Sequence, residues 1–210
     1  MWAQVKNGQV IKIFNGAQAF KIGDWQYGSD VFSKWSKSEL TEIGIYPVQQ
    51  DRTNYKNTEY YKNTEHTYTV DDTNKVVKMT WGKASGHSLV DVEIKDKDGK
   101  NILDEDGNKV VDQGLKTVKK KQINDEAYDI LNETDWYVIK ASEVSDYTLP
   151  TNIAKFRAAV RTKCNAMQTQ IDNAGDVDSL KTLYEYTNTG TEENPDMTRP
   201  LGEFPKLEDF

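Results

Sequence analysis

The stretch Leu131-Asn-Glu-Thr-Asp-Trp136, followed by Phe156-Arg-Ala-Ala-Val-Arg161, decides the architecture of the second half of this chain. The short polar side chains of the first stretch favour a helix end and a capped turn, because they hydrogen-bond the backbone there. The second stretch belongs to a helix with one apolar stripe at intervals of three and four residues, formed by Ile153, Phe156, Val160, Cys164, Met167 and Ile171. The pattern therefore predicts a helical hairpin module over residues 116–186.

The first part of the chain, residues 1–83, has the pattern of a β-rich domain with one short helix. Asn7-Gly8 lies between two apolar runs, which favours a hairpin with a type I′ turn. Further extended segments are predicted at Phe20–Trp25, Ile45–Val48, His66–Val70 and Val76–Trp81.

The short helix of this part is predicted over Ser33–Ile43. Ser36 and Glu39 have the spacing of a capping box, in which each residue hydrogen-bonds the backbone of the other. Gly44 follows at the position where the residue after a helix adopts positive φ. These three residues favour a short helix in this segment that ends before Gly44.

Residues 86–113 contain an alternating apolar segment and two Asp-Gly pairs, Asp98-Gly99 and Asp106-Gly107. They predict a β-meander with two tight turns, whose strands are too short to be stable alone. Residues 187–210 are predicted to be a flexible tail that ends in a docking peptide, Pro200–Phe210. The expected fold class is α+β: an N-terminal β-rich domain, a β-meander and a C-terminal helical hairpin with an extended tail.

Composition excludes several classes of function. The formal net charge of −7 disfavours non-specific nucleic-acid binding, which needs a basic surface. No apolar run approaches the roughly 20 residues that cross a bilayer, and the N-terminus has no apolar signal-peptide region. We therefore expect a protein made in a cytoplasm, with no nucleic-acid and no membrane partner. Cys164 is the single cysteine, which excludes an internal disulfide.

No catalytic, cofactor-binding or metal site is predicted. An EF-hand starting at Asp96 would place Lys100 at a ligand position, and one starting at Asp104 would place Lys109 where glycine is needed. The two histidines lie in separate segments without partners at zinc-ligand spacing. The sequence thus predicts a binding protein and not an enzyme.

Tyr55, Tyr60 and Tyr61 lie in a polar segment without clear periodicity. They are either anchors of a loop or an exposed, adhesive surface. A carbohydrate-binding or carbohydrate-cleaving module that uses exposed Trp and Tyr side chains is an alternative from a different functional class.

Part of the helical region resembles a short module of tailed bacteriophages, through Leu131–Trp136, Asp146, Leu149-Pro150, Phe156-Arg157 and Ala159–Arg161. In that family a Leu-x-x-Thr-Asp-Trp motif is followed by an aromatic-Arg-x-x-Leu-Arg helix, and often by a Phe-Pro element, here Phe204-Pro205. The module is usually labelled tail fibre assembly or tail assembly chaperone-like. The resemblance covers about residues 128–172, and Tyr137–Tyr147 departs from the Pro-containing linker of the family.

The resemblance implies a bacteriophage virion structural protein, associated with the tail, baseplate or fibre, that acts by protein–protein binding. Ile22–Asp24, Phe32–Leu40 and Ile43–Ile45 also look like the start of small structural proteins of marine phages. The implied partners are other phage structural proteins, such as tail or fibre subunits. The chain would be a homo-oligomer or occur in multiple copies in a symmetric virion, after synthesis in the host cytoplasm. The alternatives are a transient tail fibre assembly chaperone and a capsid decoration protein.

The predicted interaction residues are Trp136, Phe156, Arg157, Arg161, Phe204 and Phe210. Arg157 and Arg161 lie one helical turn apart and would reach carboxylates such as Glu133 or Asp135. Trp136 would cover the open end of the hairpin. The helical hairpin and the C-terminal peptide would then be the docking elements.

Overall fold

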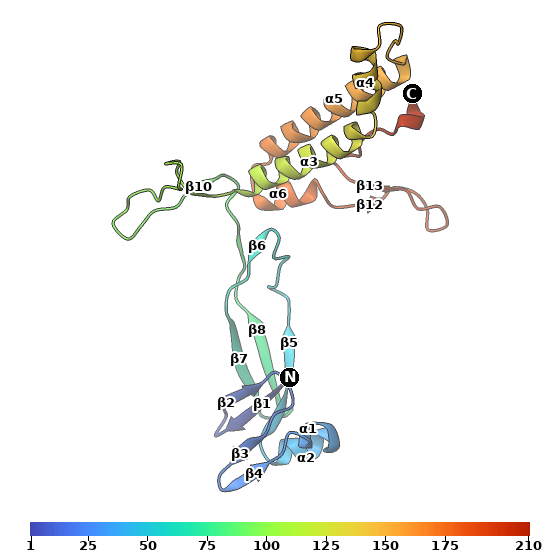
Figure 1. Cartoon of the computed structure of the whole chain (residues 1–210). Coiled ribbons are helices and arrows are strands. Elements are labelled where there is room, and N and C mark those ends of the chain that lie inside the picture. The colour runs from blue at the N-terminus through green and yellow to red at the C-terminus, as the bar shows by residue number, and fades with distance from the viewer. The chain divides into compact units, whose positions relative to one another are not determined.

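The computed structural model describes residues 1–210 and shows an α+β protein. The chain forms two compact units, Met1–Gly86 with most of the strands and His87–Phe210 with the long helices (Figure 1). The segments predicted over 86–113, 116–186 and 187–210 lie in the second unit, except that residue 86 ends the first.

The first unit is built on a five-stranded sheet in the order β2-β1-β5-β8-β7 (Figure 1). β5 and β8 are parallel, and the other neighbours are antiparallel. The edge strands β2 and β7 contact each other, so the sheet curls into a half-barrel. The strands are β1 (Trp2–Lys6), β2 (Gln9–Phe14), β5 (Ile45–Asp51), β7 (His66–Asp71) and β8 (Val76–Trp81).

Local turn chemistry explains the predicted hairpins of this sheet. Asn7 and Gly8 have φ of 53° and 71°, as a type I′ turn requires, and the β1–β2 hairpin is confirmed. The predicted β7 and β8 are also confirmed, and the Asp71 carboxylate accepts the Asn74 N–H in the turn between them at 3.1 Å.

Two predicted elements of this unit are each divided in the structure. The single strand expected over Phe20–Trp25 is wrong, because Gly23 has a φ of 58° and the chain reverses there. A small hairpin results, β3 (Phe20–Ile22) with β4 (Trp25–Tyr27). The single helix expected over Ser33–Ile43 is likewise two helices, α1 (Val31–Lys34) and α2 (Lys37–Glu42).

The predicted capping box is the reason for the division between α1 and α2. The Ser36 hydroxyl accepts the Glu39 N–H at 3.3 Å, and the Glu39 carboxylate accepts the Ser36 N–H at 2.7 Å. The Ser36 backbone is extended, so a helix cannot pass through it. The Ser36 N–H and hydroxyl lower the pKa of Glu39. Gly44 then has a φ of 79°, which confirms the predicted end of α2.

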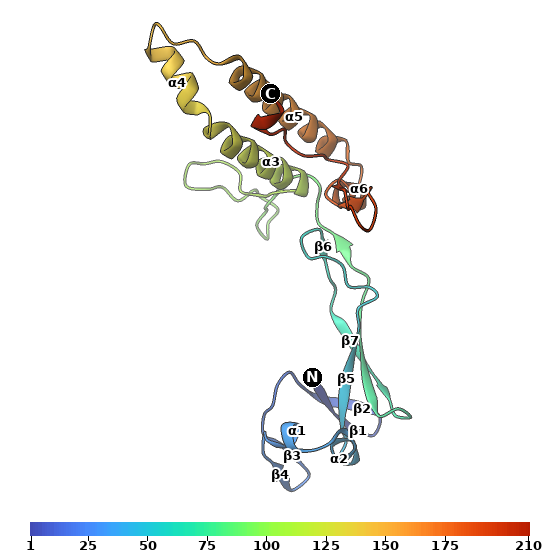
Figure 2. The same cartoon turned by 90° about the vertical axis from the view of Figure 1, so that its right-hand side faces the viewer.

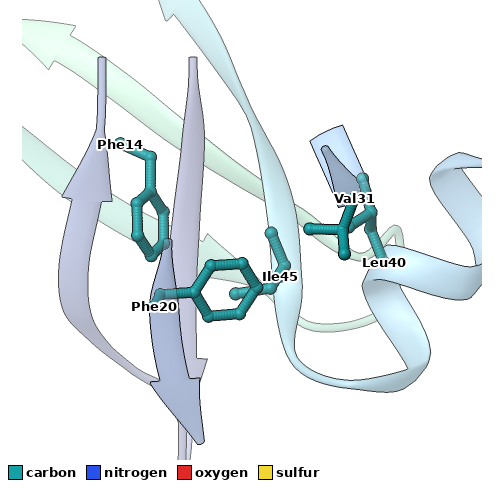
Figure 3. Packing of buried hydrophobic residues seen from close by; sticks show 5 residues of the cluster. All are labelled: Phe14, Phe20, Val31, Leu40 and Ile45. Atoms are coloured by element: carbon teal, nitrogen blue, oxygen red, sulfur yellow. The ribbon is translucent and has the colours of Figure 1, made fainter. Parts of the chain in front are cut away.

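Apolar side chains fill both faces of the sheet, because neighbours along a strand point to opposite sides. Ile45 belongs to one core and Tyr46 to the other. The second core lies inside the curl and centres on Ala3, Tyr46 and Val77. The first core lies between the sheet and the two short helices and contains Phe14, Phe20, Val31, Leu40 and Ile45 (Figure 3).

The tyrosines of the polar segment have two different environments. Tyr60 and Tyr61 are buried and act as loop anchors beside β6 (Tyr61–Lys62), which pairs with β9 (Ser85–Gly86). Tyr55 is exposed and lies edge-on against Trp81, with ring centroids 5.2 Å apart.

The second unit begins with a ribbon over residues 88–113 that differs from a regular meander. Its strands are only β10 (Val92–Glu93) and β11 (Val111–Asp112). Its centre is a closed ring of three backbone hydrogen bonds, 2.8 to 2.9 Å long: Ile94 donates to Val110, Val110 to Ile102, and Ile102 back to Ile94. These residues stand eight positions apart, so three short arms radiate from one junction.

Two of the arms have the same turn. The Asp96 carboxylate accepts the N–H groups of Asp98 and Lys100, and Asp104 makes the equivalent bonds one interval later. Gly99 and its counterpart in the second arm have positive φ, which confirms both predicted Asp-Gly turns. The third arm is the β10–β11 stem that leads to the helices.

The helices of the second unit are α3 (Leu115–Asn132), α4 (Asp135–Glu143), α5 (Thr151–Asn173) and α6 (Val177–Thr182). Figure 2 shows α5 running back alongside α3, and the two pack together. The predicted stripe of α5 is confirmed, since all six of its residues are buried. The first arm of the predicted hairpin, however, is broken at residues 133–134, where α4 begins anew.

The C-terminal segment is folded against the helices, although a flexible tail was expected. It forms β12 (Thr187–Asn188), β13 (Met197–Thr198) and the short 3-10 helix η1 (Leu207–Asp209). Leu201 is completely buried, and its N–H donates to the Leu183 carbonyl at 3.0 Å. The composition of the segment does not predict this attachment, because the segment is mostly polar and a single leucine, Leu201, is its fully buried residue.

We expect Ser36→Ala to lower the free energy of unfolding of the first unit by about 1 kcal/mol, because the Glu39 N–H loses its acceptor. Ser38→Ala, in the first turn of α2, is the matched control and should change it by less than about 0.5 kcal/mol. Urea unfolding followed by fluorescence measures both. Equal effects of the two substitutions would contradict the role of the capping box.

Candidate binding surface on the helical unit

Arg157 joins the three helices α3, α4 and α5. It stands on α5 with only 7% of its surface exposed. Its Nη1 donates to the Leu131 carbonyl and to the Thr134 hydroxyl, both at 2.7 Å, and its Nη2 lies 2.7 Å from Asp135 Oδ1. The last carbonyls of a helix have no partner within that helix, so the guanidinium satisfies one of them while it neutralises the first acid of α4.

The contact unites both halves of the phage-like motif. Thr134 is buried and, besides accepting from Arg157, donates its hydroxyl to the Leu131 carbonyl at 3.0 Å. It makes no side-chain cap of α4. The ion pair predicted between Arg157 and Asp135 is therefore confirmed, and it fixes the break at which α4 leaves α3.

α4 itself buries no side chain. Trp136 is 58% and Ile139 is 52% exposed, and Val138 and Val144 are exposed as well. The prediction that Trp136 covers the open end of the hairpin is wrong, because the break turns the indole outward, where Lys140 Nζ lies 4.9 Å from the ring centroid. The helix consequently presents an apolar face that nothing in the chain covers.

Arg161 does not reach the predicted carboxylates. It is exposed, and its Nη1 makes a long contact of 3.4 Å with the Arg157 carbonyl. It lines a cavity of about 320 Å³ between α3 and α5, with Ala127, Leu131 and Cys164 among the other lining residues. Arg161 is therefore a surface cation beside a groove, whereas Arg157 is a structural residue.

The remaining predicted residues contact one another within the chain. Phe156 is buried on α5, and the ring of Phe210 lies edge-on against it with a centroid distance of 6.0 Å. Phe204 is half-buried in the segment that leads to η1. The C-terminal peptide expected to dock on a partner thus docks on its own α5.

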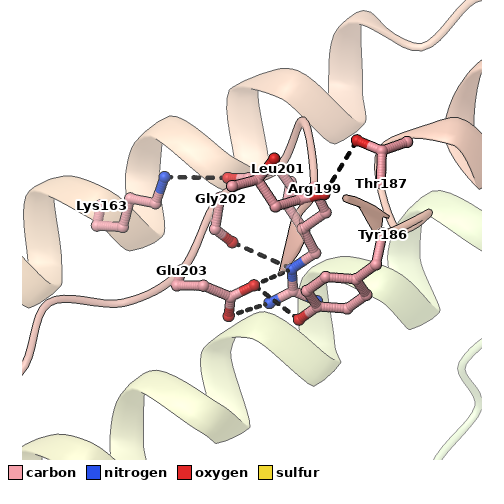
Figure 4. Close-up of polar contacts among 8 residues, drawn as sticks. Lys163, Tyr186, Thr187, Arg199, Leu201, Gly202 and Glu203 are labelled. Atoms are coloured by element: carbon pink, nitrogen blue, oxygen red, sulfur yellow. Dashed lines mark hydrogen bonds and ion pairs between the residues drawn. The ribbon is translucent and has the colours of Figure 1, made fainter. Parts of the chain in front are cut away.

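A polar network holds this segment in place (Figure 4). Arg199 Nε lies 2.8 Å from Glu203 Oε1, and Tyr186 donates its hydroxyl to the same carboxylate at 2.7 Å. The Glu203 carboxylate raises the pKa of Tyr186. Lys163 of α5 donates to the Leu201 carbonyl at 3.0 Å. The segment is therefore attached by buried apolar area and by charge-assisted hydrogen bonds.

Sequence reasoning missed two features of this unit. Lys119 is buried on α3, with its Nζ 4.6 Å from the centroid of the Tyr184 ring. The ribbon junction was missed too, although the eight-residue interval between Ile94 and Ile102 is visible in the sequence. Several apolar side chains of the ribbon are exposed: Val90, Val92, Ile94, Ile102, Leu103 and Val111.

No three or more His, Cys, Asp or Glu side chains gather in a way that could hold a metal ion. No helix combines the length and the apolar character needed to cross a bilayer. No protein-family model, curated protein or solved structure matches the chain.

Arg157→Met should lower the free energy of unfolding of the helical unit by about 2–3 kcal/mol. The substitution leaves the Leu131 carbonyl and the Asp135 carboxylate without their common donor. Arg161→Met, one turn away on the same helix, is the control and should cost less than about 0.5 kcal/mol. Chemical unfolding followed by circular dichroism tests both. The assignment fails if Arg161→Met is the more damaging change.

Leu201→Ala should cost about 3 kcal/mol, because it leaves a cavity beneath a fully buried side chain. Leu207→Ala, in the exposed η1 of the same segment, should cost under about 1 kcal/mol. Amide hydrogen exchange would show faster exchange over 199–210 in the first variant only. Rapid exchange of this segment in the unmodified protein would mean that it is not attached.

Proposed function

We propose that this protein is a bacteriophage virion structural protein, attached to the tail, baseplate or fibre, that acts by binding other structural proteins. The observation that carries the proposal is the Arg157 cluster. It brings the Leu131–Asp135 half of the phage-like motif into contact with the second half on α5. The two halves of the motif therefore form one hydrogen-bonded cluster, which supports their belonging to a single module.

The Arg157 cluster supports a binding role because it leaves an apolar face of α4 exposed. Arg157 fixes the start of α4 in an orientation that leaves Trp136 and Ile139 exposed to solvent. Tryptophan is among the residues that contribute most to protein–protein affinity, since it buries a large area at low entropic cost. A face of this kind on a monomer marks an interaction site.

The proposed docking element is accordingly α4, and no longer the C-terminal peptide. Phe210 packs against Phe156 of α5 in its own chain, and Phe204 is half-buried in the same C-terminal segment. The proposed partners remain tail or fibre subunits, and the proposed location is the virion, in several copies set by particle symmetry.

A transient tail fibre assembly chaperone is the second candidate. The exposed Trp136 and Ile139 favour it too, because a chaperone shields apolar surface of a client and is then released. The two candidates differ in whether the protein remains in the finished particle.

Quantitative mass spectrometry on purified particles of the encoding phage tests the proposal. A tail component should be present in a small symmetric multiple, for example about 6 or 12 copies. Hundreds of copies would indicate a capsid decoration protein, and absence from particles but abundance in lysate would indicate a chaperone.

A matched pair of phage variants makes the same test specific for α4. Trp136→Ser should reduce the copy number in particles, whereas Trp25→Ser should leave it unchanged. Trp25 is the suitable control because it is 74% exposed and belongs to the first unit, whereas the helical module belongs to the second. Equal incorporation of both variants would contradict the role of α4.

A further inference from the structure

The face of α4 that the chain leaves uncovered has a regular composition. Trp136, Ile139, Lys140 and Glu143 follow one another at helical spacing and lie on one side of the helix. With nine residues and no buried side chain, α4 is shorter than helices that are stable alone in water. Packing of this face against another surface would supply the stabilisation that its own unit does not.

The charged side chains on this face indicate what kind of partner would bind it. Asp135 is neutralised by Arg157, so Lys140 and Glu143 are the charged side chains of α4 that remain. Neither makes an ion pair within the chain, and the Lys140 ammonium lies over the rings of Trp136 and Tyr147. One face thus carries one cation and one anion, three residues apart.

We propose that α4 pairs antiparallel with α4 of a second copy of this chain, about a twofold axis level with Ala141 and Ser142. In this register Lys140 of each copy faces Glu143 of the other, so the same ion pair forms twice. The proposal rests on the proposed function only in that both assign α4 to binding.

Charge complementarity is the reason for choosing a second copy over an unrelated partner. A twofold interface places the same surface on both sides, so it requires a surface that complements itself. Two chains with a net charge of −7 repel at long range, and a contact between them needs local opposite charges. The Lys140–Glu143 arrangement supplies these in the antiparallel direction, whereas a parallel arrangement would set like charges against each other.

The same register also brings apolar side chains of the two copies together. Ile139 of one copy faces Val144 of the other, and both are about half exposed in the single chain. The chain continues past Glu143 in a turn, with the Tyr147 N–H bonded to the Val144 carbonyl at 3.0 Å.

Sedimentation velocity on the full chain over a wide range of concentration tests the pairing. The expected result is a reversible dimer of twice the 24.0 kDa chain mass. The double variant Trp136→Ser, Ile139→Ser should be monomeric and keep its helical circular dichroism. An unmodified protein that stays monomeric at all concentrations would overturn the proposal.

Charge reversal tests the register. K140E and E143K should each weaken the dimer by about tenfold, because each sets two pairs of like charges face to face. An equimolar mixture of the two variants should dimerise again, since every contact then joins an acid to a base. K155E, on an exposed position of α5, is the control and should not change the association.

A mixture that associates no better than either variant alone would overturn the Lys140–Glu143 register. The dimer test is independent of the particle test. A dimer that is absent from particles leaves this inference standing and the proposed function refuted. A protein that is monomeric in solution but present in particles would refute this inference and leave the proposed function standing.

Discussion

The guanidinium of Arg157 is the constraint on which the helical unit depends. This one buried cation donates to the last turn of α3, pairs with the first residue of α4 and is itself held on α5, next to Phe156 of the apolar stripe. Burying a charge is costly unless it is paired and hydrogen-bonded, and the break between α3 and α4 supplies three acceptors to Arg157, which constrains the geometry of the break. The orientation of α4, and therefore of its apolar face, follows from that requirement.

The chain has only 36% hydrophobic residues, and its two units bury them in different ways. The first unit curls a small sheet so that both of its faces are covered, with a separate apolar cluster on each. The second unit folds its C-terminal segment over α5, and thereby covers Phe156 and buries Leu201. In both units, short segments cover apolar side chains that would otherwise be exposed.

Local signals in the sequence predicted local structure well. Asn7-Gly8, the Ser36–Glu39 capping box and the apolar stripe of α5 each depend on residues close together in the chain, and each is present. Contacts between distant residues were harder. The attachment of the C-terminal segment depends on one leucine and a polar network, and neither leaves a periodic pattern. The outward position of Trp136 depends on the angle between two helices, which spacing alone does not determine.

The three-armed ribbon has a consequence for how this chain can change during evolution. Its junction needs only three backbone hydrogen bonds, and two of its arms repeat one eight-residue unit built around Asp96 and Asp104. Backbone bonds do not depend on side-chain identity, so the junction constrains the sequence little, and side-chain requirements are confined to the Asp and Gly residues of the two turns. The ribbon is therefore the part of the molecule where duplication or loss of an eight-residue arm disturbs the rest of the fold least.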